Sequence, residues 1–356
     1  LAEDRAFFYL NRVYSAYGGE NTKLSLAFQR EVINNIVPRV QPDLIHCNDW
    51  MTGLIPAMSR QMGIPCLITI HNIHTVKSTL AHIEDRGIDA AYFWQHLFYE
   101  TFSATYEEAW DSNPVDFLAS GVFGAHFVNT VSPRFLEEIV EGRHDFVAWP
   151  LRQELTNKFH ASCGTGILNA PDPAFNPETD KDIHCNYTAG DHPAGKMENK
   201  RHLQEELGLI RDDNAPLFFW PSRLDPVQKG CQLLAEAFYG IISGYWDMNL
   251  QVVFVANGEY QQTFRDIVNH HGFHSRVAVC DFNETLEHLA YAAADFILMP
   301  SLFEPCGLPQ MIAPIYGALP VAHDTGGIHD TITHLDVEQG GGNGFLFENY
   351  NAGGLY

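Results

Sequence analysis

The chain has 356 residues, of which 46% are hydrophobic and 18% are charged, a composition typical of a soluble globular protein. Its length exceeds what one hydrophobic core usually organises, so we expect two domains. A formal net charge of −23 argues against nucleic acid and anionic membranes as partners, and no apolar run approaches the roughly 18 residues that cross a bilayer.

Strands and helices alternate through the first half of the chain. Residues 43–47 and 65–71 have the apolar pattern of buried strands, and residues 50–62 between them have the pattern of a helix. Residues 123–131 predict another strand, and the Ser-Pro pair that follows predicts a helix with a Ser cap and Pro in its first turn. This order is typical of a parallel sheet.

The second half repeats the alternation. The predicted strands are 216–221, 250–256, 277–280, 296–300 and 319–322, and predicted helices lie near 231–242, 260–271 and 284–293. Because helices separate these strands, we expect a second doubly wound sheet. The Gly-rich end, residues 340–354, is predicted to be loop.

These patterns predict an α/β protein. Residues 1–168 are assigned to a first Rossmann-like domain, residues 169–200 to a linker rich in Asn, Pro, Asp, Gly and His, and residues 201–356 to a second Rossmann-like domain. Two such domains that face each other across a cleft form the GT-B architecture, in which ligands bind at the carboxyl ends of the strands.

The most informative segment follows the predicted strand 296–300. It is Pro300-Ser-Leu-Phe-Glu-Pro-Cys-Gly-Leu-Pro-Gln310, and it places Glu304 at the carboxyl end of that strand. The amides of Gly307 and Leu308 are predicted to lie at a helix N-terminus, which attracts anions such as a diphosphate. A carboxylate there can hold sugar hydroxyls or stabilise positive charge at an anomeric carbon, although it can also simply cap the helix.

Two further segments follow strands of the same half. Ser222-Arg-Leu-Asp-Pro-Val-Gln-Lys-Gly230 carries Arg223 and Lys229, two cations that can neutralise a leaving diphosphate, although two surface cations would give the same pattern. Asp324-Thr-Gly-Gly-Ile328 is a glycine turn that lets the backbone approach a phosphate closely, but such a turn alone is a weak signal.

Polar side chains also end two strands of the first half. The segments His46-Cys-Asn-Asp-Trp50 and Ile70-His-Asn-Ile73 follow the strands 43–47 and 65–71. We therefore expect Asp49, His71 and Asn72 to face the cleft and to bind sugar hydroxyls. A single His at a strand end is more often structural, but here polar groups recur at adjacent strand ends.

Neither a metal site nor a disulfide framework is expected. Asp180-Lys-Asp182 is a formal acidic pair of the kind that holds Mg²⁺, but it lies in the predicted linker. The seven cysteines are scattered without a C-x-x-C pair, and free thiols suit the cytoplasm. The start, Leu1-Ala-Glu-Asp-Arg5, has neither an initiator Met nor a signal-peptide pattern, so we expect the chain to begin within a longer protein.

Together these segments resemble bacterial glycogen synthases and plant starch synthases. The resemblance rests on Pro300-Ser-x-Phe-Glu-Pro-Cys-Gly-Leu-x-Gln310, Ser222-Arg-Leu with Gln228-Lys-Gly230, Thr325-Gly-Gly327, His46-x-x-Asp-Trp50 and Gly166-Ile-Leu-Asn169. It runs in one consistent order from about residue 41 to about residue 332, and the Glu-Pro-Cys-Gly-Leu run is its most specific part.

The resemblance implies retaining transfer of glucose from ADP-glucose to the non-reducing end of an α-1,4-glucan, without metal or cofactor, in a bacterial cytoplasm or a plant plastid. It implies catalytic roles for Glu304, His71 and Asp49, with Asn72 and Trp50 on the acceptor side. The implied donor-binding residues are Arg223, Lys229, Asn169, Cys306, Gly307, Leu308, Thr325, Gly326, Gly327 and Phe282, which stands where the family has a Tyr that stacks on adenine.

The chain departs from the family pattern at several places. The family's N-terminal Lys-x-Gly-Gly-Leu loop is absent from the sequence, Pro309 replaces a Thr, Leu302 replaces an Arg, and one extra residue separates Arg223 from Lys229. Three interpretations therefore stay open: a synthase that uses ADP-glucose, a related transferase that uses UDP-glucose or another acceptor, and a non-catalytic glucan-binding relative.

Overall fold

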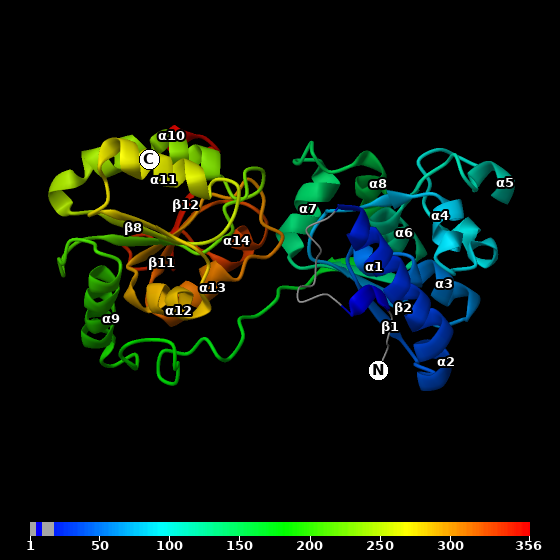
Figure 1. Cartoon of the computed structure of the whole chain (residues 1–356), viewed down its shortest axis with the longest axis horizontal. Helices are drawn as coiled ribbons and strands as arrows, with labels where there is room; N and C mark the ends of the chain where they lie inside the picture. Colours follow the sequence, from blue (N-terminus) through cyan, green and yellow to red (C-terminus); the bar gives the residue numbers. More distant parts are fainter. Residues whose placement is uncertain (1–4, 9–17) are drawn as a thin grey trace. The chain divides into compact units, whose positions relative to one another are not determined.

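The structure is a computed structural model that describes residues 5–8 and 18–356. The chain divides into two compact units, Leu1–Leu168 and Asn169–Tyr356, each with its own parallel sheet (Figure 1). The expectation about the start of the chain concerns residues 1–5, of which only Arg5 belongs to the described residues. Within the described ranges, no helix is both long and apolar enough to cross a membrane.

The first unit is built on a four-stranded parallel sheet with the order β1-β2-β5-β6. Its strands are β1 (Ile45–Asn48), β2 (Cys66–Ile70), β5 (Phe127–Thr130) and β6 (Gly164–Gly166). The two strands predicted at 43–47 and 65–71 are confirmed. The strand predicted at 123–131 begins only at Phe127, because the apolar residues before it end a buried helix, and an apolar run alone does not distinguish a helix from a strand.

Helices and a small antiparallel pair surround this sheet. The helices are α1 (Gly18–Glu31), α2 (Val37–Val40), α3 (Ile55–Gln61), α4 (Leu80–Asp85), α5 (Tyr106–Ala109), α6 (Phe117–Gly124), α7 (Pro133–Glu141) and α8 (Trp149–His160), and the pair is β3 (Lys77–Ser78) with β4 (Val115–Asp116). The predicted start of α7 is confirmed, because the Ser132 side chain accepts a hydrogen bond from the Phe135 amide at 2.9 Å.

The second unit has a six-stranded parallel sheet with the order β12-β11-β10-β7-β8-β9. Its strands are β7 (Leu217–Trp220), β8 (Gln251–Val255), β9 (Val277–Cys280), β10 (Phe296–Met299), β11 (Leu319–His323) and β12 (Phe345–Phe347). The five strands predicted for this half are confirmed. The prediction of a loop over 340–354 is wrong at β12, which pairs with β11, and at a short last helix, α15 (Ala352–Leu355).

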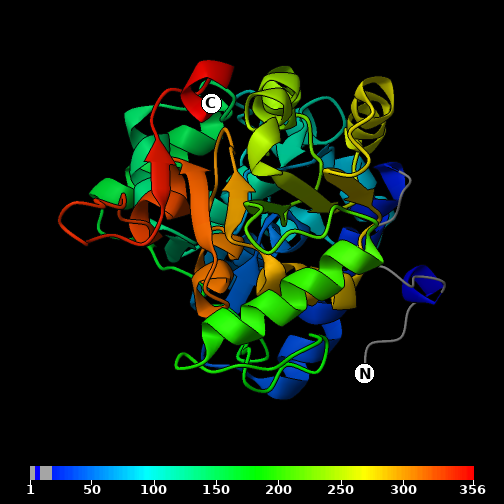
Figure 2. The same cartoon turned by 90° about the vertical axis from the view of Figure 1, so that its left-hand side faces the viewer.

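Helices cover both faces of the second sheet. One face carries α10 (Cys231–Gly244), α11 (Gln261–His271) and α15, and the other carries α9 (His192–Glu206), α12 (Glu284–Ala293), α13 (Pro309–Ile315) and α14 (Gly326–Thr331). In Figure 2, α9 (green) crosses below the strands and α15 (red) lies above them. Alternate residues of β7 enter the two apolar cores, so the strand is buried on both faces, as parallel strands usually are.

The segment predicted to be a linker, residues 169–200, belongs instead to the second unit. Its last part is the start of α9, and Ile183 and Tyr187 lie in the core shared with α12 and α13. The Tyr187 hydroxyl donates to the carbonyl of Tyr316 at 2.8 Å. The expectation failed because turn-forming residues surround these few apolar anchors and hide them from a composition argument.

Candidate active site

The topology of the second sheet brings two of the predicted segments together. The strand order reverses between β7 and β10, which are hydrogen-bonded neighbours. A doubly wound sheet has its ligand crevice at this point, outside the carboxyl ends of the strands. Arg223 and Lys229 follow β7, and Glu304 follows β10, so segments far apart in sequence meet at this crevice.

Glu304 is a buried carboxylate that is held on one side only. Its side chain accepts through Oε2 from the Lys229 ammonium at 2.6 Å and from the Ser301 hydroxyl at 3.1 Å, and the residue is 4% exposed. Within the described part of the chain, its Oε1 has no hydrogen-bond partner. A carboxylate with one oxygen fixed and the other free can accept a hydrogen bond from a ligand hydroxyl or face a developing positive charge.

The alternative role of Glu304 as a helix cap is wrong. Helix α13 begins at Pro309, and the residue in the cap position is Leu308. Lys229, expected on a diphosphate, instead contacts the carboxylate of Glu304.

Sequence reasoning missed the residues that hold the Glu304 loop. Ser301 is buried, and its carbonyl oxygen is 2.7 Å from Nδ1 of His323. The loop after β7 binds the same segment, because the Leu302 amide donates to the Gln228 carbonyl at 2.8 Å. Ser301 belongs to the motif after β10. Its position in that motif was the only feature of the sequence that could have indicated a role for it.

Two backbone amides beside Glu304 are available to an anion. The Gln310 side-chain amide donates to the carbonyls of Cys306, at 2.7 Å, and Gly307, at 3.0 Å. Because a trans peptide points its N–H opposite to its C=O, the amides of Gly307 and Leu308 point away from Gln310. Neither amide donates a hydrogen bond to another described residue. The anion site at the start of α13 stays a prediction, and Gly307 makes the turn there with a left-handed φ of 74°.

The glycine turn after β11 has a different role from the expected one. The Gly327 amide donates to the Glu304 carbonyl at 2.9 Å, so it is already occupied. A Cβ at Gly326 would lie 2.0 Å from the Glu304 carbonyl oxygen, and a Cβ at Gly327 would lie 2.1 Å from the Cys306 carbonyl oxygen. The glycines are therefore required for close packing of α14, with Thr325 at its cap position, against the Glu304 loop.

Replacing Gly327 by Ala is expected to lower the free energy of unfolding by about 1–3 kcal/mol, the usual cost of overpacking. The measurement is a denaturant unfolding curve. Gly240→Ala is the matched control, because a Cβ at Gly240, inside α10, meets nothing within 4 Å. This control is expected to be stabilising by roughly 0.5–1 kcal/mol. Equal unfolding midpoints for the two variants would contradict the packing role.

Asn257 forms hydrogen bonds with the segments that carry two exposed donor-side candidates, Arg223 and Phe282. Its carbonyl accepts from the Leu224 amide at 3.0 Å, and its Oδ1 accepts from the Phe282 amide at 3.1 Å. Arg223 is exposed, and Phe282 is 53% exposed, which leaves its ring free to stack on a planar group.

Asn169 approaches the same loop from the start of the second unit. Burial raises the pKa of the Cys306 thiol, and a hydrogen bond from the Asn169 backbone opposes that shift. This contact puts the Asn169 backbone beside the motif after β10, and the nucleotide-side role of Asn169 stays a prediction.

In the first unit, Asp49 organises the ends of β1 and β2. It has a left-handed φ of 52°, which is uncommon outside glycine, and its Oδ1 accepts from the amides of His71 at 2.7 Å and Asn72 at 3.3 Å. Burial raises the pKa of the Asp49 carboxyl, and these hydrogen bonds oppose the shift. The three predicted polar residues therefore lie together.

His71 and Trp50 differ in their availability to a ligand. His71 is exposed, and its Nε2 is 2.9 Å from Oδ1 of Asn48, which orients the ring. Trp50 is 4% exposed and packs edge-on against His74, with ring centroids 5.8 Å apart. The expectation that Trp50 faces an acceptor is therefore not met, because its ring belongs to the core of the first unit.

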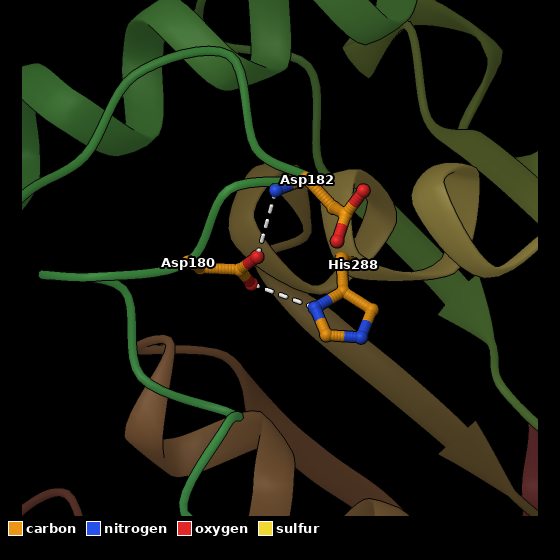
Figure 3. Close-up of side chains that lie close together, drawn as sticks. All are labelled: Asp180, Asp182 and His288. Carbon is orange, nitrogen blue, oxygen red and sulfur yellow. Dashed lines mark hydrogen bonds and ion pairs between the residues drawn. The ribbon is translucent and has the colours of Figure 1, made fainter.

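The acidic pair of the predicted linker lies beside a histidine that the sequence analysis did not connect with it. Atoms of Asp180, Asp182 and His288 that can bind a metal lie within 4.8 Å of one another (Figure 3). Asp180 Oδ2 accepts from His288 Nδ1 at 2.7 Å and from the Tyr316 hydroxyl, and its Oδ1 accepts from the Asp182 amide at 2.9 Å. These contacts use most of the carboxylate's acceptor capacity, so we interpret Asp180 as a tether between its segment and helix α12.

Comparison with known proteins agrees with this geometry. The family model described as "Starch synthase catalytic domain" matches residues 1–148, and the model "Glycosyl transferases group 1" matches residues 215–356. The chain is 34% identical to a glycogen synthase of Clostridium botulinum (strain Eklund 17B / Type B), over 97% of this chain and 72% of that protein. It is 33% identical to a glycogen synthase of Bacillus subtilis (strain 168), over 97% of this chain and 70% of that protein.

Solved structures give the same result for the fold. The catalytic domain of starch synthase IV from Arabidopsis thaliana, bound to ADP and acarbose, matches with a TM-score of 0.81 and 27% identity, over 98% of this chain and 70% of that one. Anabaena HepE in complex with UDP matches with a TM-score of 0.55 and 18% identity, over 91% of this chain and 70% of that one, which concerns the fold alone. The predicted GT-B fold class, with two doubly wound α/β domains, is confirmed.

Proposed function

The chain belongs to the glycogen synthase family of glycosyltransferases, and we propose that it transfers glucose from ADP-glucose to the non-reducing end of an α-1,4-glucan with retention of the anomeric configuration. The observation that carries the proposal is the Glu304 carboxylate at the switch point of the second sheet, held by Lys229 and Ser301. Beside it are two amides that donate to no residue in the described ranges 5–8 and 18–356. We also propose a cytoplasmic location, which suits seven free cysteines.

The donor would be held entirely by groups of the second unit. The amides of Gly307 and Leu308 and the guanidinium of Arg223 would bind the diphosphate, where fixed donors stabilise the charge that develops as the phosphate leaves. The free Oε1 of Glu304 would accept a hydrogen bond from a glucose hydroxyl. The side chain of Phe282 would stack on the nucleotide base.

In the proposed step, the bond between the anomeric carbon and the diphosphate oxygen breaks and a bond from that carbon to the acceptor oxygen forms. The leaving diphosphate oxygen takes the acceptor proton, so no second carboxylate is needed. Asp49, with the His71 and Asn72 that it orients, is proposed to bind sugar hydroxyls of the substrates.

The substitution of Pro309 for a Thr does not remove this anion site. Pro309 is in the first turn of α13, where the backbone N–H has no intrahelical partner in any case. The amides that we propose to bind the diphosphate belong to Gly307 and Leu308, and both remain. This favours the catalytic interpretation over a non-catalytic glucan-binding relative.

The test is transfer of radiolabelled glucose onto glycogen, with ADP-glucose and UDP-glucose compared at equal concentration. Transfer from ADP-glucose at the higher kcat/KM would support the proposal. Transfer from UDP-glucose alone would keep the reaction class and replace the donor. No transfer from either donor, with glycogen still bound, would favour the non-catalytic interpretation.

Chelation is expected to leave the rate unchanged, because the proposed charge stabilisation comes from Arg223 and backbone amides. The measurement is the initial rate of transfer before and after dialysis against EDTA. A rate that falls with EDTA and returns with Mg²⁺ or Mn²⁺ would contradict the proposal that transfer needs no metal. In that case Asp180→Asn would show whether the cluster in Figure 3 is responsible.

A further inference from the structure

His323 is a buried histidine at the same edge of the second sheet as Glu304. It is the last residue of β11, which pairs in parallel with β10, the strand that Glu304 follows. The residue is 8% exposed, so most of its polar ring is removed from water. A buried polar group needs a hydrogen-bond partner, and the identity of that partner shows what the residue holds.

The partner of His323 determines where its ring carries a hydrogen. Nδ1 lies 2.7 Å from the carbonyl oxygen of Ser301. A carbonyl oxygen can only accept, so Nδ1 carries the hydrogen and donates. A different side chain could therefore replace His323 if it placed a donor at this position, and a side chain of similar shape without a donor could not.

The bond from His323 reaches Glu304 through a single residue. Ser301 is 1% exposed, and its hydroxyl donates to Glu304 Oε2 at 3.1 Å. The same oxygen accepts from Lys229 at 2.6 Å. His323 thus fixes the backbone of the residue whose side chain fixes one oxygen of the carboxylate. A shift of the Ser301 peptide would move that hydroxyl, and misplacement of a reacting group by about 1 Å can cost roughly 10²-fold in rate.

Two aromatic rings hold the imidazole of His323 in place. Phe347 is its partner across β11 and β12, with ring centroids 5.4 Å apart, and the Tyr350 ring lies at 5.0 Å. Tyr350 is itself anchored, because its hydroxyl accepts from the Gln232 side chain at 3.3 Å. Gln232 lies in the first turn of α10, close after Lys229 in the sequence. Packing therefore restricts the ring to the orientation in which it donates to Ser301.

We propose that His323 is a positioning residue for the transfer reaction: its Nδ1–H fixes the Ser301 peptide, and through Ser301 it sets the place of the Glu304 carboxylate. The inference rests on the proposed function for its effect on the rate, whereas its effect on the order of the Glu304 loop does not. A core histidine without this role would stabilise the fold alone. The two roles differ in their effect on kcat at unchanged stability.

The experiment compares His323→Leu with His323→Asn in the whole chain. Asn presents an amide N–H close to the position of the imidazole Nδ1–H, whereas Leu has nearly the same shape and no donor. We expect His323→Leu to lower kcat for transfer onto glycogen by about 10–100-fold and to change the KM for the nucleotide sugar less than about twofold. His323→Asn is expected to keep kcat within about threefold of the unmodified chain.

A double-mutant cycle separates positioning from general destabilisation. If His323 acts through Glu304, His323→Leu lowers kcat less than about twofold in a chain that already carries Glu304→Gln. His288→Leu is the matched control, because His288 is also 8% exposed and its Nδ1 contacts Asp180 instead of the Glu304 loop. The control is expected to lower the melting temperature and to leave kcat unchanged.

Three outcomes would overturn the proposal. The first is an equal loss of kcat in His323→Leu and His323→Asn, the second is an undiminished loss in the Glu304→Gln background, and the third is an equal loss in His288→Leu. Melting temperatures show whether each variant keeps the fold. If His323→Leu does not fold, His323→Gln takes its place, because the amide of Gln reaches the position of the imidazole Nε2 and not that of Nδ1.

Hydrogen exchange of the backbone amides between residues 301 and 308 gives a measurement that does not depend on transfer. We expect faster exchange in His323→Leu and unchanged exchange in His323→Asn and His288→Leu. Unchanged exchange in all three variants would contradict the role of His323 in holding the loop. The expected pattern of exchange, in a chain that transfers glucose from neither donor, would support that role and refute the proposed function.

Discussion

Replacement of Glu304 by Ala is expected to lower kcat by about 10²–10³-fold, the usual loss when one fixed group that stabilises the transition state is removed. The carboxylate is buried, and two hydrogen bonds fix Oε2, whereas Oε1 has no hydrogen-bond partner among the described residues. A preformed charge of this kind acts in the transition state without reorganisation, so its loss should appear in kcat more than in KM. The measurement is steady-state transfer of glucose onto glycogen.

The same substitution leaves the partly buried Lys229 ammonium without its carboxylate, so stability must be measured beside the rate. Glu304→Gln is the better-matched variant, because it keeps the side-chain volume and can still accept from Ser301. A large loss of kcat in Glu304→Gln at an unchanged melting temperature would assign the effect to the charge. A kcat within twofold of the unmodified chain in both variants would contradict the role of Glu304.

The strands of the second sheet were predictable because a strand buried on both faces is a continuous apolar run. Within the two parallel sheets, two strands escaped prediction for physical reasons. Residues 164–166, which form β6, are Gly-Thr-Gly and offer no apolar pattern, and β12 is three residues long and follows a run of glycines. At Gly166 an added Cβ would lie 2.1 Å from the Pro133 nitrogen, a packing constraint that appears only in three dimensions.

The candidate site was predictable where it depends on strand ends. The rule that parallel strands end at one edge of a sheet placed Asp49 beside His71, and the structure joins them by a hydrogen bond. The contact between Lys229 and Glu304 spans 75 positions in the sequence, and no local pattern encodes it. For Trp50 the strand-end rule gave a wrong expectation. A position at the end of a strand does not reveal that a large ring packs into the core.

Replacement of Arg223 by Ala is expected to lower kcat/KM for the nucleotide sugar by about 10–100-fold, the value of one or two hydrogen bonds to a charged group. The chain has 44 Asp and Glu residues against 21 Lys and Arg residues, so an exposed Arg readily finds a carboxylate. Arg223 is exposed, and its guanidinium has no ion-pair or hydrogen-bond partner among the residues that the structure describes. This leaves the side chain available to an anionic donor at the end of β7.

Two controls separate specific contact from general charge. Arg211→Ala removes the same charge from an exposed residue that precedes β7, at the opposite end of the strand, and is expected to change kcat/KM less than twofold. Arg223→Lys keeps the charge but loses the planar fork, so an intermediate loss is expected. One outcome is that Arg211→Ala and Arg223→Ala lower kcat/KM for the nucleotide sugar equally, and that added salt brings both variants to the kcat/KM of the unmodified chain. Arg223 would then contribute only to the overall electrostatic field of the protein. A loss confined to Arg223 and insensitive to salt would mean direct contact with the diphosphate.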